Sequence, residues 1–155
     1  IRSGGPVTIT VPSMTRFLLS LDQAVDTVFA VLKEGRAGDT FVPRAPSATV
    51  ENLAKALIGD RRIEIKVTGI RPGEKMHEIM ISEEEIHHTH QVGNYYAIRS
   101  MLPEVGSYNN NNAGLSGEYS SNSEVLNLEG TIALLKKNGL LDIYHSHDEH
   151  NEILK

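Results

Sequence analysis

Two consecutive segments, Ile63-Glu64-Ile65-Lys66-Val67 and Arg71-Pro72-Gly73-Glu74-Lys75-Met76-His77-Glu78, carry the most information in this chain. Apolar residues alternate in the first segment, which predicts a strand. The second begins with a Pro-Gly turn, and residues 74–79 are expected to form a short helix. Arg71 and Glu74 would then stand three residues apart on a turn between a strand and a helix.

This cation and carboxylate have two interpretations. The planar guanidinium of Arg71 matches phosphate oxygens bidentately, and the Glu74 carboxylate can accept hydrogen bonds from both hydroxyls of a ribose. Together they would suit the nucleoside diphosphate end of a nucleotide sugar. The alternative is an exposed ion pair at a helix start, which contributes roughly a few tenths of a kcal/mol. Spacing alone favours the alternative, because Arg-x-x-Glu is a common pattern.

Upstream of this turn the sequence predicts a strand and a capped helix. β-branched residues alternate over residues 7–11 and indicate the strand. Ser20 and Gln23 form a capping box, apolar residues follow at helical spacing, and Gly35 is the expected stop. The apolar stripe of this helix, like that of a second helix capped by Thr49, is expected to face the core.

The remaining segments complete an alternation of strands and helices. We expect a short strand at residues 41–42, an edge strand at 95–98 and a last helix over 128–137. This order indicates an α/β protein, α+β within the chain itself, with a small sheet in place of a full doubly wound one. Residues 1–143 are expected to form one domain with a flexible Asn/Gly-rich loop at 104–117, followed by a polar tail at 144–155.

Composition narrows the class of protein. The chain has 155 residues, of which 39% are hydrophobic and 23% charged, and its net charge is −5. This charge argues against nucleic-acid binding, and no apolar run approaches the roughly 20 residues that span a bilayer. The absence of cysteine suits a reducing cytoplasm, where we expect the protein to act. The chain does not begin with Met, so we interpret it as a fragment or a trimmed chain.

Four blocks of sequence resemble a known family over about residues 1–140. That family is the extended short-chain dehydrogenase/reductases that act on nucleotide sugars, in particular the inverting UDP-N-acetylglucosamine 4,6-dehydratases of bacterial polysaccharide biosynthesis. The resemblance lies in the C-terminal, substrate-binding part. The blocks are Pro6-Val7-Thr8-Ile9-Thr10 with Met14-Thr15-Arg16-Phe17, Phe41-Val42-Pro43-Arg44-Ala45-Pro46-Ser47-Ala48-Thr49, Gly69-Ile70-Arg71-Pro72-Gly73-Glu74-Lys75 with His77-Glu78, and Glu118-Tyr119-Ser120-Ser121-Asn122.

The resemblance implies a reaction for the complete enzyme. A bound NADP would take hydride from C4, water would be eliminated across C5 and C6, and return of hydride to C6 would give a 4-keto-6-deoxy sugar inverted at C5. The expected class is therefore a lyase that makes bacterial surface glycans, a homo-oligomer at full length. NADP would be bound by a missing N-terminal half, and this chain would hold the UDP-sugar.

The resemblance also implies roles for individual residues. Arg16 and Arg71 would share the diphosphate, Glu74 would hold the ribose, and Thr8 lies in the strand whose backbone faces the uracil. Tyr119, Ser120 and Ser121 would contact the sugar or close the site over it. Serine and asparagine also favour turns, so simple turn chemistry is the alternative for this last group. Many relatives have a His near residues 122–123, where this chain has none.

The sequence assigns no catalytic, cofactor-binding or metal-binding residue to this chain. Gly35-Arg36-Ala37-Gly38 has two glycines and follows a helix, so it does not match a dinucleotide cradle. No Tyr is followed by Lys four residues later, so the Tyr-x-x-x-Lys pair of the superfamily is absent. We therefore predict that the chain alone is inactive and does not bind NADP tightly.

Several alternatives remain open. The parent enzyme could be a UDP-sugar 4-epimerase, the chain could be a non-catalytic UDP-sugar binding module, or the helix at 20–34 could pack against another subunit. A metal site is a further alternative, because imidazoles two or three residues apart can share an ion. The absence of cysteine and the polar surroundings argue against it. The histidines concerned are His87, His88, His90, His145, His147 and His150.

Overall fold

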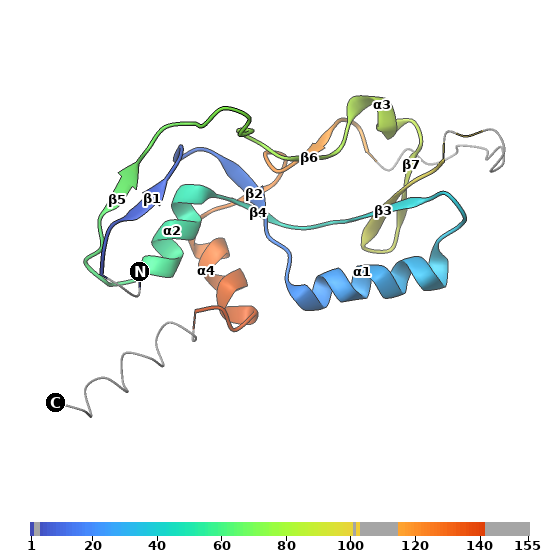
Figure 1. Cartoon of the computed structure of the whole chain (residues 1–155). Coiled ribbons are helices and arrows are strands. Elements are labelled where there is room, and N and C mark those ends of the chain that lie inside the picture. The colour runs from blue at the N-terminus through green and yellow to red at the C-terminus, as the bar shows by residue number, and fades with distance from the viewer. Residues whose placement is uncertain (2–3, 101, 103–114, 142–155) are drawn as a thin grey trace.

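The computed structural model describes residue 1, residues 4–100, residue 102 and residues 115–141. These residues form a mixed α/β fold with four small sheets and four helices (Figure 1), which confirms the predicted class. The helices are α1 (Leu21–Glu34), α2 (Val50–Ile58), α3 (Glu83–Ile86) and α4 (Leu128–Lys137). The strands are β1 (Val7–Ile9), β2 (Thr15–Phe17), β3 (Thr40–Pro43), β4 (Ser47–Thr49), β5 (Ile65–Val67), β6 (Ile79–Ile81), β7 (Thr89–Val92), β8 (Tyr95–Ile98), β9 (Tyr119–Ser120) and β10 (Val125–Leu126).

The two sheets with parallel pairs lie at the end of the molecule that holds α2 and α4 (Figure 1). Strand β1 pairs parallel with β5, with Val7 opposite Ile65. Strand β4 lies between β10 and β2, parallel to the first and antiparallel to the second. The chain continues this pairing after β5, because Thr68 N–H donates to the Ile9 carbonyl at 2.8 Å and Gly69 N–H to the Thr10 carbonyl at 3.0 Å. The loop after β5 therefore starts beside the carboxyl end of β1.

The other two sheets are antiparallel, with the order β3-β8-β7 and the pair β6-β9. Buried Val42, Ile81, Tyr96 and Ile98 form one core cluster between these sheets. A second cluster lies between α2 and α4 and contains Ala56, Leu135 and Leu141. The fold thus has two small cores, one for each group of sheets.

Helix caps agree with the sequence. The Ser20 hydroxyl accepts from Gln23 N–H, and the Gln23 side chain accepts from Ser20 N–H, so the predicted capping box is present. Thr49 accepts from Asn52 N–H at the start of α2, and Asn127 accepts from Gly130 N–H at the start of α4. Each of these caps satisfies a backbone donor that the first turn of a helix leaves free.

Three predictions about local structure are wrong. Residues 74–79 form no helix, because Ile79 begins β6 and pairs with Ser120 of β9. Strand β8 is central, since it pairs with both β3 and β7. The apolar stripe of α1 does not face the core, because no residue of that helix is buried.

Most of the predicted loop at 104–117 and the whole tail at 144–155 lie outside the described residues. Among the helices that are described, none is long and apolar enough to cross a membrane.

Candidate functional site

The loop after β5 is closed by contacts between Arg71 and Glu74. The backbone N–H of Arg71 donates to Glu74 Oε2 at 3.1 Å. The backbone N–H of Glu74 donates to the Arg71 carbonyl at 3.1 Å. Gly73 has a φ of +83°, a conformation that side chains with a Cβ rarely adopt. Glu74 thus shapes the loop with one carboxylate oxygen, and the other oxygen forms no hydrogen bond with the described residues.

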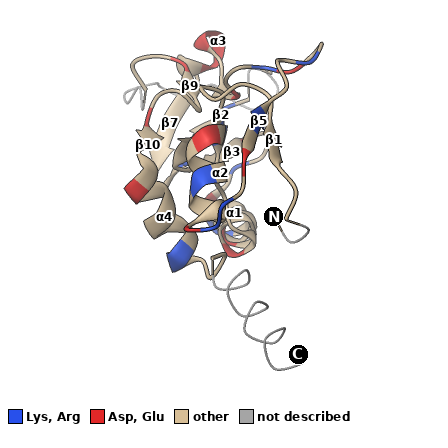
Figure 2. Cartoon of the chain, turned by 90° about the vertical axis from the view of Figure 1, so that its left-hand side faces the viewer, with Lys and Arg blue, Asp and Glu red and all other residues tan. Residues whose placement is uncertain are grey.

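The Arg71 side chain is exposed and forms no hydrogen bond or ion pair with the described part of the chain. Lys75 is exposed on the same loop, and Figure 2 shows basic and acidic residues next to each other there. A guanidinium and an ammonium beside one carboxylate make a surface that can bind a doubly charged anion.

Arg16 is engaged by protein groups on all three guanidinium nitrogens. Nη1 donates to the carbonyls of Thr15 at 2.7 Å and Met76 at 3.4 Å, and Nη2 lies 3.0 Å from Met14 Sδ. Nε lies 3.5 Å from Glu78 Oε1. Arg16 therefore holds the far end of the loop 71–78 against β2, and a phosphate would have to replace Glu78 to reach its Nε.

A buried hydroxyl pair anchors the same end of the loop. Ser121 Oγ lies 2.6 Å from Thr15 Oγ1, which in turn lies 2.8 Å from His77 Nδ1. Ser121 Oγ also accepts from Glu78 N–H at 2.9 Å, and Ser121 N–H donates to the Glu78 carbonyl at 2.8 Å. Ser121 has no exposed surface, so in this conformation its hydroxyl positions the loop and is closed to a ligand.

Tyr119 packs against the core cluster that lies between the two antiparallel sheets. Its hydroxyl donates to the Ala45 carbonyl and accepts from Ala45 N–H, both at 3.0 Å. Its ring packs 5.2 Å from Phe17 and 5.3 Å from Tyr96, between centroids. Burial raises the pKa of Tyr119 above its ordinary value, and the hydrogen bond to Ala45 only partly opposes this rise. The phenol is therefore neutral and serves the fold in this conformation.

The structure gathers some of the predicted site residues and separates others. Arg16 reaches the loop of Arg71 and Glu74 through Met76. Thr8 is exposed on β1, opposite Lys66 of β5. Ser120 is half-buried, and its hydroxyl accepts from Asn122 N–H at 3.3 Å. Direct sugar contacts by Tyr119, Ser120 and Ser121 stay predictions.

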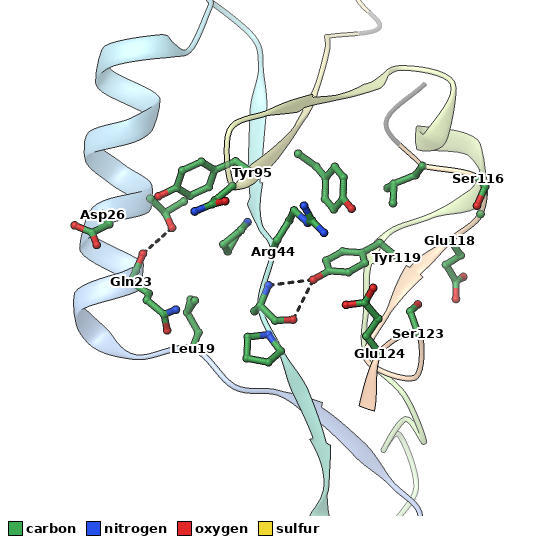
Figure 3. A pocket seen from close by; sticks show the side chains of 18 residues that line it. Leu19, Gln23, Asp26, Arg44, Tyr95, Ser116, Glu118, Tyr119, Ser123 and Glu124 are labelled. Atoms are coloured by element: carbon green, nitrogen blue, oxygen red, sulfur yellow. Dashed lines mark hydrogen bonds between the residues drawn. The ribbon is translucent and has the colours of Figure 1, made fainter. Parts of the chain in front are cut away.

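A cavity of about 740 Å³ lies between α1, the link from β3 to β4, and the segment around β9 (Figure 3). Arg44 projects into it, with its guanidinium 5.6 Å from the centroid of the Tyr96 ring. Gln23, Asp26 and Glu124 add polar groups to its wall. Tyr119 is the one predicted site residue that lines this cavity. Arg44 and Glu118 also line it and stand in blocks that carry the family resemblance, but the sequence assigned no role to them.

Residues 35–38 do not have the geometry of a dinucleotide cradle. Residues 35–38 connect α1 to β3, so they join a helix to a strand, whereas a pyrophosphate cradle joins a strand to a helix. His87 and His88 lie in the turn after α3, and His90 lies on β7; the described part of the chain contains no group of three or more potential metal ligands. His145, His147 and His150 lie outside that part.

Comparisons with known proteins give a consistent picture. A family model described as "Polysaccharide biosynthesis protein" matches residues 1–100. Two proteins named UDP-glucose 4-epimerase, from Rickettsia massiliae and Rickettsia bellii, are 46% and 45% identical over 100 residues. Each match covers 63% of this chain and 29% of the relative, so the chain spans less than a third of their length.

A solved structure, "X-ray structure of Pen from Bacillus thuringiensis", is also similar. Its TM-score is 0.75 at 27% sequence identity, over 88% of this chain and 42% of that one. The expected lyase class is wrong, because the relatives named above are epimerases, and an epimerase is an isomerase that inverts a centre without eliminating water.

Proposed function

The chain belongs to the polysaccharide biosynthesis protein family, and from this premise we propose that it binds the UDP portion of a UDP-hexose for a 4-epimerase. The observation that carries the proposal is the loop 71–78. There an exposed Arg71, whose guanidinium has no hydrogen bond or ion pair with the described residues, and a half-buried Glu74 stand together on one turn. The names of the Rickettsia relatives support a UDP-hexose as the ligand and epimerisation at C4 as the reaction.

In this proposal each group has a separate task. The Arg71 guanidinium binds the diphosphate bidentately. Arg16 binds the same diphosphate when a phosphate oxygen replaces Glu78 as its partner. The free oxygen of Glu74 accepts from the ribose, while exposed backbone next to Thr8 of β1 faces the uracil. Binding so far from the reacting carbon would orient the hexose without contributing to the chemical step itself.

The test is a titration of the 155-residue chain with UDP and with uridine, by calorimetry. Arg71→Ala is expected to weaken UDP binding about 10- to 100-fold, as loss of a charge-assisted contact worth roughly 1.5–3 kcal/mol predicts. The same substitution is expected to leave uridine binding within about 2-fold, because uridine carries no phosphate.

Arg62→Ala is the matched control, since Arg62 is also exposed but lies before β5. It should leave both affinities unchanged. Equal UDP binding by Arg71→Ala and the native chain would remove Arg71 from the site.

The reaction itself is tested in a chimera. The matched segment of the Rickettsia massiliae relative is replaced by the corresponding part of this chain, and conversion of UDP-glucose to its C4 epimer is followed by chromatography. We expect activity to persist, because the exchanged part supplies UDP binding. A folded chimera that binds UDP without epimerising it would contradict the assignment to a 4-epimerase.

A further inference from the structure

The cavity beside α1 contains a cation that the fold does not neutralise. The Arg44 guanidinium forms no hydrogen bond or ion pair with the residues that the structure describes. Its one recorded contact is with the face of the Tyr96 ring, 5.6 Å from the centroid. Its five N–H donors are therefore available to a ligand.

Tyrosine rings form much of the apolar wall. Tyr95, Tyr96 and Tyr119 all line the cavity, and Figure 3 shows Tyr95 and Tyr119 on either side of Arg44. The fold holds these rings in place, because the Tyr119 and Tyr96 centroids lie 5.3 Å apart and the Tyr95 ring packs 6.1 Å from Phe41. Aromatic rings held in this way give a ligand fixed apolar faces to pack against.

Three carboxylates complete the polar part of the wall. Asp26 comes from α1, Glu118 precedes β9 and Glu124 precedes β10. All three residues are exposed, and their carboxylates form no ion pair with the described residues. The wall thus carries three negative charges and the single positive charge of Arg44.

This arrangement of charges disfavours two classes of ligand. A diphosphate would meet three carboxylates, and a polyamine would meet the guanidinium in the middle of the cavity. A neutral ligand with many hydroxyls avoids both conflicts, because a hydroxyl can donate to a carboxylate and accept from a guanidinium. A ring that also has C–H faces could pack against the tyrosines.

We propose that this cavity binds a neutral sugar ring, a single hexose or a short chain of hexoses. Arg44 and Glu124 would bond its hydroxyls, and the tyrosine rings would contact its apolar faces. The volume of about 740 Å³ lies within the roughly 300–1,000 Å³ of ligand cavities. No residue of the loop 71–78 lines the cavity, so this inference does not rest on the proposed binding of UDP.

Tyrosine fluorescence can follow the ligand directly. The chain has no tryptophan, and three of its five tyrosines line the cavity. We expect glucose, galactose or mannose to change the fluorescence of the 155-residue chain saturably, with a Kd of about 1–50 mM. The absence of a saturable change with all three hexoses, up to about 200 mM, would overturn the proposal.

Two charged probes test the class of ligand. Spermidine carries positive charges and inorganic pyrophosphate carries negative charges, and neither absorbs where tyrosine is excited. We expect neither probe to occupy the cavity. Saturation by spermidine at lower concentrations than by any hexose would assign the cavity to a cation. A pyrophosphate response that Arg44→Ala abolishes would assign it to an anion, and either result would overturn the proposal.

Substitutions in the wall locate the binding. Arg44→Ala and Glu124→Ala are each expected to weaken hexose binding about 5-fold or more, because each removes a charged hydrogen-bonding group. Both side chains are exposed, so the thermal midpoint should stay within about 2 °C of the native value. Unchanged hexose affinity in Arg44→Ala would overturn the proposal.

The matched controls are Arg62→Ala and Glu64→Ala, which replace exposed charged residues that do not line the cavity. Both should bind hexose as the native chain does, and an equal loss in the controls would contradict a site at Arg44. The two cavity variants should keep the native affinity for UDP, so this proposal and the proposed function can fail separately.

Discussion

At the scale of single residues, the end of the loop 71–78 depends on a buried hydroxyl. Ser121 Oγ accepts from Glu78 N–H and touches Thr15, with no exposed surface. Ser121→Ala is expected to destabilise the chain by about 1–3 kcal/mol, because buried partners lose their hydrogen bond. Chemical unfolding measures this change. Ser120→Ala is the control, since the Ser120 hydroxyl accepts one long hydrogen bond from Asn122 N–H. An equal loss of unfolding free energy in both variants would contradict the role of Ser121.

Glu78 provides a second prediction at this scale. It pairs with Arg16 at 3.5 Å, so a bound diphosphate and Glu78 would compete for the same guanidinium. Both side chains are about a third or more exposed, so solvent weakens the pair. We expect Glu78→Gln to strengthen UDP binding about 2- to 5-fold in calorimetry. Weaker binding would instead indicate that Arg16 acts only by holding the loop in place.

At the scale of elements, strand β7 carries a histidine with a perturbed pKa. Burial lowers the pKa of His90, and the positive charges of Arg99 and Arg36 lower it further, while Asp39 and a hydrogen bond with Ala97 oppose them. Its Nδ1 is buried and has no hydrogen-bond partner within the part of the chain that the structure describes. Folding therefore favours the neutral imidazole.

The sign of the pH effect follows from this shift. Below the ordinary pKa of about 6.5 the unfolded chain binds a proton that the folded chain takes up only at lower pH. We expect the thermal midpoint to be level above pH 7 and to fall as the pH drops below about 6.5. His90→Gln should reduce this fall, whereas His88→Gln should not. Identical pH profiles for the native chain and His90→Gln would exclude His90 as the cause.

At the scale of the whole molecule, we expect the chain alone to bind UDP but not NADP. The described residues offer no strand–glycine turn–helix for a pyrophosphate, while the loop 71–78 offers cations for a nucleoside diphosphate. Calorimetry with both nucleotides on one sample makes the comparison. Stoichiometric, tight binding of NADP would contradict the proposal that this chain binds UDP and leaves NADP unbound.

Local signals in the sequence determined much of the fold. The capping box of Ser20 and Gln23 and the caps at Thr49 and Asn127 act over three residues, so the local sequence is enough to predict them. The four blocks that resemble nucleotide-sugar enzymes also led to the correct family, although they gave the wrong reaction class. Backbone recognition by β1 leaves no such signature, so the part of Thr8 stays a prediction.

Only the tertiary structure decided which face of each element is covered. Periodicity gives the apolar stripe of α1 but not its direction, and β3 and the cavity turn that stripe outward. Residues 79–81 form a strand because β9, far along the chain, pairs with them, and the same pairing buries Ser121. The sequence by itself determined the three longer helices, their caps and the family. The tertiary structure decided burial, pairing and the open surface, because these depend on contacts between distant segments that local propensity does not encode.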